Sequence, residues 1–217
     1  MFIGHYSASF VAKAIAPAVP LWLLLVAAQL VDIAWGVLVL SGVERATLDL
    51  SLASNPLVLQ HMPYTHSLVA TLVWSLVAFA IANKAFGFAV RESFVVALVV
   101  ASHWFLDLIV HRPDLPLLAT VPKLGLGLWN FPVFAFALEV LLLLVAVWFC
   151  ARAMPVRSDR RRFWYGFAIL LAIIQTMTSF GPTPSTLPAM IASALVLYAL
   201  IPYAGRSVER YHRRANY

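Results

Sequence analysis

The feature that most constrains this chain is an apolar stretch with ionisable side chains inside it. Residues 93–104 contain no charged residue, yet His103, Asp107 and His111 follow one another at intervals of four. At about 100° per residue the first two differ by roughly 40° and the outer two by roughly 80°, so all three share one helix face. A carboxylate at the centre of a bilayer costs at least about 2.5–3.5 kcal/mol, so Asp107 needs a partner. The two imidazoles are candidates, either in a metal site or in a His–Asp pair that fixes packing.

The composition indicates a polytopic membrane protein. Of the 217 residues, 63% are hydrophobic and 11% are charged, against about 45–50% and 25% in soluble domains. No basic residue precedes the first apolar stretch, so a cleaved signal peptide is not expected. Cys150 is the single cysteine, which excludes an internal disulfide and a thiolate metal site.

The chain is expected to fold as an all-α bundle of six full membrane spans plus a short N-terminal membrane helix, with residues 1–217 forming one domain. The spans are expected at residues 19–40, 65–83, 92–110, 128–150, 163–180 and 187–204, followed by a basic tail, residues 205–217.

The segments between the spans have their own signatures. Residues 2–16 reach only about 22 Å, less than the bilayer core of about 30 Å, and proline closes them off, so they form an interfacial helix or a short, re-entrant span. Residues 41–64 form a polar connection too long for a hairpin turn. Residues 112–127 form a loop rich in proline and glycine. The third span should end near His111, because a residue before proline avoids the α region.

The basic residues fix the expected orientation. With the C-terminus in the cytoplasm and six alternating spans, twelve of the 15 Lys and Arg residues lie on the cytoplasmic side, and only Arg45, Arg112 and Lys123 lie outside. This asymmetry follows the positive-inside rule. The arginines at residues 160–162 are therefore interpreted as a cytoplasmic anchor, so the bilayer, and not nucleic acid, is the expected partner.

In this orientation several polar side chains share one depth. His66 opens the second span from the outer side, Asp32 lies in the outer half of the first, and His103 and Asp107 lie near the outer end of the third. His5 joins them if residues 2–16 descend from the outer side. Three helices, and with His5 a fourth, would thus bring ionisable groups to the outer leaflet.

Imidazole and carboxylate together are typical ligands of zinc, iron and manganese. Three histidines and two aspartates suit one or two divalent ions with a position for water, the usual nucleophile of ester and phosphoester hydrolysis. A His–Asp network that only locks helices, or an ion or proton pathway, uses the same residue types. Glu139, midway along the fourth span, is either a packing partner or a general base. His111, at the helix end, is a weaker ligand candidate.

Several motifs occur in a fixed order between residues 4 and 140: Gly4-His5, Gln29-Leu-Val-Asp32, His61-x4-His66-Ser67, Ser102-His103-Trp-x2-Asp107, His111-Arg-Pro-Asp-Leu-Pro-Leu117, Gly125-Leu-Gly-Leu-Trp-Asn130 and Glu139. The set resembles the bacterial family of membrane-bound metal-dependent hydrolases. The resemblance implies an inner-membrane protein with His5, Asp32, His66, His103 and Asp107 as the metal set. It also implies a distant similarity to helical zinc-dependent phospholipase C enzymes.

The chain departs from the family pattern in two places. Asp32 stands alone where better-known members carry Pro-Asp-x-Asp, and His61-Met-Pro-Tyr-Thr-His66 replaces His-Arg-Gly-x-Thr-His. A lost ligand counts against a second metal. The sequence therefore predicts a divalent-metal-dependent hydrolase, with zinc the first choice and iron or manganese the others, that acts on a lipid or phosphoester at the outer leaflet. A non-catalytic membrane scaffold or accessory subunit is the first alternative, and an ion or proton transporter is the second.

The charge asymmetry gives a direct test of topology. Reporter fusions at Arg160 and Asn216 should read cytoplasmic, while a fusion at Asn55 should read periplasmic, because the basic segments stay inside. A periplasmic signal at Arg160 would reverse the orientation and move the His/Asp cluster to the inner leaflet.

Overall fold

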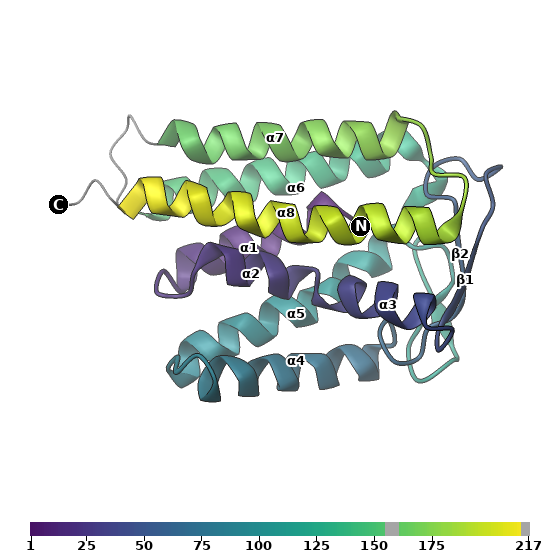
Figure 1. Ribbon diagram of the computed structural model, residues 1–217, viewed down its shortest axis with the longest axis horizontal. Helices are drawn as coiled ribbons and strands as arrows, with labels where there is room; N and C mark the ends of the chain where they lie inside the picture. Colours follow the sequence, from purple (N-terminus) through teal and green to yellow (C-terminus); the bar gives the residue numbers. More distant parts are fainter. Residues whose placement is uncertain (155–160, 214–217) are drawn as a thin grey trace.

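The computed structural model describes residues 1–154 and 161–213, with side chains described up to residue 209 (Figure 1). This part of the chain folds into eight α-helices and two small β-hairpins. The helices are α1 (Ile3–Ile15), α2 (Leu21–Ala28), α3 (Leu30–Leu40), α4 (Leu68–Lys84), α5 (Val90–Val110), α6 (Pro132–Ala153), α7 (Arg161–Phe180) and α8 (Leu187–Arg213).

The helices lie roughly along one direction, and the hairpins are at one end of the bundle. Figure 1 shows α6, α7 and α8 on one side, α4 and α5 on the other, and α1 and α2 between them. One antiparallel hairpin joins β1 (Arg45–Leu48) to β2 (Leu57–His61). The second joins β3 (Leu115–Pro116) to β4 (Lys123–Leu124) and leads through a 3₁₀ turn at Leu128–Asn130 into α6.

The predicted helical bundle is confirmed in outline, while the count of six full spans is not. Among the described residues, four helices are long and apolar enough to cross a membrane: α5, α6, α7 and the Leu187–Glu209 part of α8. A fifth is reached if α2 and α3 together form one span. The apolar α4 has 17 residues and reaches only about 25 Å.

The span expected at residues 19–40 is broken in the middle. It divides at Gln29 into α2 and α3, which are bent by 50°. At the break the Gln29 N–H turns back to the Val26 carbonyl at 3.2 Å, and its side-chain amide donates to the Phe2 carbonyl at 3.0 Å. An i→i−3 bond of this kind tightens the last turn of a helix, so the next turn starts in a new direction.

Two other segments differ from the sequence expectation. Residues 41–64 hold the β1–β2 hairpin with a long loop, and α8 continues through Arg213, so much of the tail at 205–217 is helical. The end of α5 agrees with prediction: the helix stops at Val110 and His111 caps it. The fusion sites at Arg160 and Asn216 lie outside the described residues.

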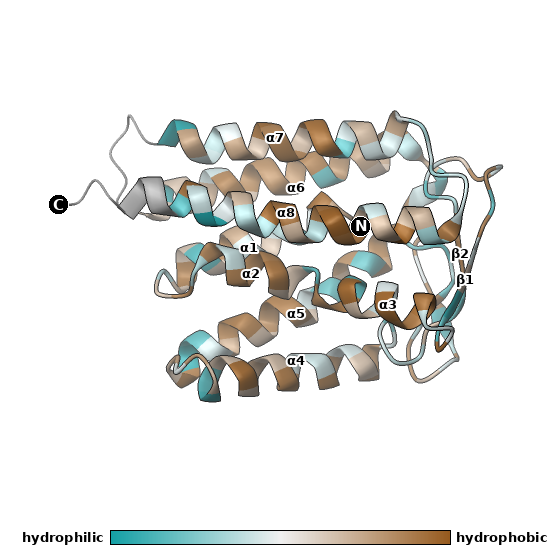
Figure 2. Ribbon diagram, viewed as in Figure 1, coloured by the Kyte–Doolittle hydropathy of each residue, from teal (hydrophilic) through white to brown (hydrophobic). Residues whose placement is uncertain are grey.

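The core of the bundle is built around α1, which the sequence analysis placed as an interfacial or re-entrant helix. Ile3, Tyr6 and Phe10 are fully buried. They belong to one apolar cluster with Val100 of α5 and Leu143 of α6. Hydrophobic residues colour most of each helix (Figure 2), and polar residues occur at the helix ends and in a patch where α3 approaches α5. The short N-terminal helix is therefore the buried centre of the fold.

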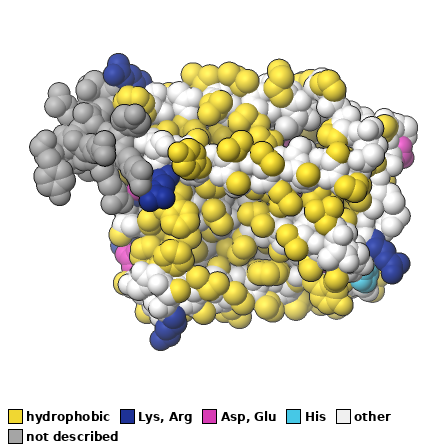
Figure 3. Space-filling model, viewed as in Figure 1, with side chains coloured by type: hydrophobic (Ala, Val, Ile, Leu, Met, Phe, Trp, Pro, Cys, Tyr) yellow, Lys and Arg dark blue, Asp and Glu magenta, His cyan; other side chains and the backbone are white. Residues whose placement is uncertain are grey.

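The outer surface is strongly apolar. Large side chains such as Leu76 of α4, Phe134 of α6 and Tyr203 of α8 are each about 70% exposed. In Figure 3 hydrophobic side chains spread across the middle of the visible face, while Lys and Arg lie near its two ends. Exposed apolar surface on this scale is unusual for a soluble monomer, and it suits contact with lipid.

A buried ion pair holds α1 to α8 at the end opposite the hairpins. Lys13 Nζ lies 2.6 Å from Glu209 Oε1, and it also donates to the Pro17 and Val19 carbonyls at 2.8 Å. The second Glu209 oxygen accepts the Leu21 N–H at 2.9 Å. One carboxylate thus binds both sides of the turn between α1 and α2.

Removing one partner of this pair should destabilise the protein strongly. Glu209→Ala removes the carboxylate that lies 2.6 Å from the buried Lys13 ammonium, so we expect a loss of about 3–5 kcal/mol of unfolding free energy. Thermal or denaturant unfolding of the purified protein in detergent measures the loss. The double variant Lys13→Met with Glu209→Ala should recover part of it, because no charge stays buried. Equal losses in the single and double variants would show that the pair itself does not hold the turn.

Candidate metal centre

Three helices and the segment before a fourth bring the predicted ionisable residues to one buried cluster. His103 and Asp107 come from one face of α5, with His111 as its cap. His5 comes from α1, Asp32 from the first turn of α3, and His66 from the residues just before α4. The four histidines and Asp107 are each at most 4% exposed, and Asp32 is partly buried. The structure therefore brings together all six residues that the sequence analysis selected as ligands.

Asp107 is the hub of the cluster. Its Oδ2 lies 3.2 Å from His103 Nε2, 3.4 Å from His111 Nε2 and 3.7 Å from His66 Nε2. Its Oδ1 faces the opposite way, 3.1 Å from His5 Nε2 and in an ion pair with the amino group of Met1. The two oxygens of this one carboxylate thus lie within 3.7 Å of four imidazoles.

Asp32 closes the cluster from the side of α3. Its Oδ1 lies 3.2 Å from His66 Nε2 and 3.4 Å from His103 Nε2. Its Oδ2 accepts the hydroxyl of Tyr198 on α8 at 3.1 Å. His66 and His103 therefore stand between two carboxylates.

The break between α2 and α3 sets the tautomer of His103. In a continuous helix the Ala28 carbonyl would accept the N–H four residues on. Here it is 2.9 Å from His103 Nδ1. A carbonyl can only accept a hydrogen bond, so Nδ1 carries the proton. Nε2, which faces the two carboxylates, has a bare lone pair in the neutral ring.

The same logic applies to His66 and His111. The Thr65 hydroxyl donates to the Glu44 carboxylate at 2.7 Å, so its oxygen accepts from His66 Nδ1 at 2.9 Å. His111 Nδ1 donates to Asp114 Oδ1 at 2.9 Å. Outer partners of this kind orient metal-binding histidines. In three imidazoles the Nδ1 position is occupied and Nε2 points into the cluster.

Where these imidazoles are neutral, their Nε2 lone pairs face carboxylate oxygens, an arrangement that a cation stabilises. His103 Nε2 and both nitrogens of His5 are buried and make no hydrogen bond. Two sets of three donor atoms, each within 4.8 Å of one another, can hold an ion: His5, His103 and Asp107, and Asp32, His66 and His103. His103 belongs to both sets, and one imidazole nitrogen binds one ion.

The spacing of the donors fits a small divalent ion. Ligand atoms about 2.0–2.2 Å from a tetrahedral zinc ion lie about 3.3–3.6 Å from one another. The nitrogen–oxygen distances across the cluster run from 3.1 to 3.7 Å. Three of these distances, at 3.1–3.2 Å, also suit hydrogen bonds, and the other three, at 3.4–3.7 Å, are longer than hydrogen bonds of this type.

Glu139 supports the cluster from outside. Its Oε2 accepts the Phe2 and Gly4 backbone N–H groups at 2.7 and 3.1 Å. A Cβ on Gly4 would lie 3.3 Å from the Glu139 Cγ, so the glycine allows α1 to approach α6. Glu139 thus fixes the helix turn that carries His5. The alternative role of general base stays a prediction.

Several contributors could not be read from the sequence motifs. Glu44 and Tyr198 lie outside the motifs, and Thr65 and Asp114 lie inside them, where the motifs assign them no role. The Ala28 carbonyl depends on a helix break that hydropathy does not reveal. His61, in contrast, lies in β2 and stacks edge-on against Tyr64, with ring centroids 6.5 Å apart, so its motif position does not make it a ligand.

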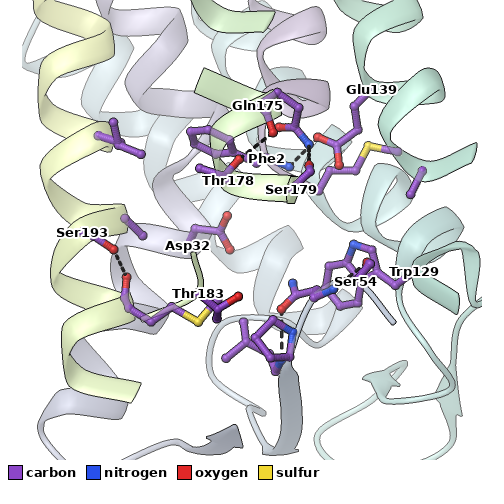
Figure 4. Close-up of a pocket in the computed structure, with 18 of the residues that line it drawn as sticks. Phe2, Asp32, Ser54, Trp129, Glu139, Gln175, Thr178, Ser179, Thr183 and Ser193 are labelled. Atoms are coloured by element: carbon purple, nitrogen blue, oxygen red, sulfur yellow. Dashed lines mark hydrogen bonds between the residues drawn. The ribbon is translucent and has the colours of Figure 1, made fainter. Parts of the chain in front are cut away.

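A cavity of about 440 Å³ opens beside the cluster. Asp32, His66, Asp107 and His111 line its inner side, and Glu139 lines it from α6. Figure 4 shows Gln175, Thr178 and Ser179 of α7 at one end, Ser54 and Trp129 at the other, and Asp32 between them. Its volume is within the range of about 300–1,000 Å³ that is typical of small-molecule sites.

Comparison with known proteins adds no relative to this description: no family model, no curated protein and no solved structure matches the chain.

The hydrogen bond that orients His66 can be tested by a matched pair of variants. Thr65→Val keeps the side-chain shape but removes the acceptor of His66 Nδ1–H, so affinity for a divalent ion should fall about 10- to 100-fold. Competition with a chromophoric zinc chelator measures it. Ser67→Ala is the control, because the Ser67 hydroxyl donates to the Pro63 carbonyl and accepts the Ala70 N–H as the cap of α4. Equal zinc affinity in Thr65→Val and the parent protein would remove Thr65 from the site.

Proposed function

We propose that the chain is a membrane-embedded, divalent-metal-dependent hydrolase that acts on a lipid or phosphoester at the outer leaflet. The observation that carries the proposal is the set of imidazole Nε2 atoms held by their Nδ1 partners against the buried Asp107 carboxylate and the partly buried Asp32 carboxylate. Donors arranged in this way are stabilised by a cation. A neighbouring cavity large enough for a substrate supports catalysis over a purely structural ion.

Asp32, His66, His103 and Asp107 would hold the ion, with His5 and His111 on either side of Asp107. Nitrogen and oxygen donors in this number favour zinc, with iron or manganese as alternatives. A bound divalent ion lowers the pKa of water toward 7 and so supplies a nucleophile at neutral pH. The chain itself positions the donors, excludes bulk solvent from them and leaves the cavity side open for a substrate.

The proposed setting is the bacterial inner membrane with the C-terminus in the cytoplasm. In this arrangement α2 and α3 form one bent span and α4 is a short span, which together with α5, α6, α7 and α8 gives six. The cluster then lies toward the hairpin end of the bundle, which faces outward. The positive-inside asymmetry of the basic residues supports this orientation.

The second candidate function is a non-catalytic scaffold or accessory subunit whose cluster locks helices. It is favoured by one observation: the imidazole nitrogens lie 3.1–3.7 Å from the Asp32 and Asp107 oxygens, and His66 Nε2 is hydrogen-bonded to Asp32 Oδ1 at 3.2 Å. Protonated imidazoles in these positions would satisfy the carboxylates without a metal. Buried polar networks of this kind fix helix register without any ligand.

Metal analysis of cluster variants separates the two functions. If His103 and Asp107 are ligands, Ala at either position should abolish stoichiometric metal while expression survives, because removal of a buried charge also removes its desolvation cost. His111→Ala should cause a smaller loss of metal. Elemental analysis of protein purified without chelator gives the answer.

The scaffold predicts the opposite pattern. His103→Ala would then leave Asp107 short of a partner and cost about 3–5 kcal/mol of stability, Asp107→Asn would be much milder, and the parent protein would contain no zinc, iron or manganese. A parent protein that contains no metal would contradict the hydrolase proposal.

A further inference from the structure

The charges that line the cavity suggest which lipid it accepts. Three carboxylates line it, those of Asp32, Asp107 and Glu139, and no lysine or arginine is present among the described lining residues. With the imidazoles neutral, the positive charges of the Met1 ammonium and of one divalent ion together equal the negative charges of the three carboxylates. No net positive charge remains for an anionic headgroup.

Arg112 does not line the cavity, but it contacts two residues that do, Asn55 and Trp129. Its Nε donates to the Asn130 side chain at 3.1 Å and its Nη1 to the Asn55 carbonyl at 3.2 Å. The guanidinium also lies over the Trp129 ring, 5.9 Å from the centroid. Its Nη2 is buried and makes no hydrogen bond. Because Arg112 is not among the lining residues of the cavity, this nitrogen is not counted among the groups that meet a headgroup.

Neutral polar groups supply the other contacts in the cavity. They are Ser54, Asn55, Gln175, Thr178, Ser179, Thr183 and Ser193. The Thr178 hydroxyl donates to the Gln175 carbonyl at 3.1 Å, and the Ser179 hydroxyl accepts from the Gln175 amide at 3.1 Å (Figure 4). Each hydroxyl keeps further hydrogen-bonding capacity. Such groups suit alcohols and ester carbonyls, and they cannot neutralise an anion.

The cavity also reaches the lipid-facing surface. Phe136, Ile191 and Leu197 form apolar parts of its wall. Met177 lines the cavity and is 63% exposed on α7. An acyl chain could therefore lie against apolar side chains from the bundle surface to the cluster, while a polar headgroup meets the hydroxyl side chains.

We propose that the cavity takes an uncharged acyl lipid with a hydroxyl-bearing headgroup, such as a diacylglycerol, in preference to an anionic phospholipid. This rests on the proposed hydrolase function and narrows its substrate to a carboxylic ester. In the reaction the oxygen of water bonds to the acyl carbon and the ester C–O bond breaks. The proton of water passes to the departing alcohol oxygen, which gives a fatty acid and a monoacylglycerol.

A matched pair of lipids tests the charge preference. Zinc-loaded protein is placed in phosphatidylcholine vesicles with either dioleoylglycerol or dioleoyl phosphatidic acid, which differ only in the phosphate group. For the binding measurement, both lipids are used with brominated acyl chains. Bromine quenches tryptophan fluorescence, and Trp35 and Trp129 line the cavity. Released fatty acid, measured by mass spectrometry, reports turnover. Half-maximal quenching should need about tenfold less diacylglycerol than phosphatidic acid.

Variants at two lining positions sharpen the test. Thr178→Lys adds a cation to the cavity and should change the preference about tenfold toward phosphatidic acid, whereas Thr178→Met, the uncharged control, should not change it. Ala194→Phe fills the cavity and should remove the quenching of the cavity tryptophans while zinc stays bound. The quenching that this variant keeps comes from tryptophans that face lipid, and it is subtracted as background.

The outcomes separate this inference from the proposed function. Zinc-bound protein that binds phosphatidic acid as tightly as diacylglycerol, or a Thr178→Lys variant with unchanged preference, overturns the inference and leaves the metal site standing. Protein that contains no metal but prefers diacylglycerol overturns the hydrolase and keeps the lipid site. Preferential binding of diacylglycerol without release of fatty acid by the zinc-loaded protein overturns the ester reaction.

Discussion

Two carboxylates inside an apolar bundle determine where most other polar groups of this protein lie. An ionised carboxylate without partners is very costly in a medium of low dielectric constant. Asp107 and Asp32 are accordingly surrounded by imidazoles from α1, from α5 and from the segment before α4, and by the Tyr198 hydroxyl of α8. Helices from all parts of the chain therefore converge at one point, and the apolar core packs around that arrangement.

The irregular parts of the backbone serve the same cluster. The break at Gln29 frees the Ala28 carbonyl for His103, the connection before the hairpin carries Glu44 to Thr65, and the loop after α5 carries Asp114 to His111. Each of these contacts occupies the Nδ1 atom of one histidine, and the Nε2 atom of that histidine faces the cluster. A regular helix offers no free carbonyl in its interior, so a site of this design requires breaks and loops next to the spans.

The parts of this arrangement that depend on local sequence could be predicted. The shared face of His103 and Asp107 follows from helical periodicity, and the end of α5 follows from Pro113. The break in residues 19–40 could not be predicted, because α2 and α3 are apolar on both sides of Gln29. The hairpin in residues 41–64 and the contact of Glu44 with Thr65 depend on pairing across long separations. Hydropathy also does not distinguish lipid-facing from protein-facing apolar residues, so the central position of α1 was missed.

That central position explains how a helix of 13 residues, about 20 Å long, can hold a place inside a membrane bundle. Its first N–H groups are accepted by Glu139, and Lys13 at its other end donates to the carbonyls that follow the helix. The Ile15 carbonyl at the end of the helix accepts from the Arg91 guanidinium at 3.3 Å. Protein groups thus bind the backbone at both ends of the segment, as a low-dielectric setting requires. A slip of one residue would move His5 by about 1.5 Å and turn it by about 100°, out of reach of Asp107. The Lys13–Glu209 pair therefore helps to set the geometry of a cluster at the opposite end of the same helix.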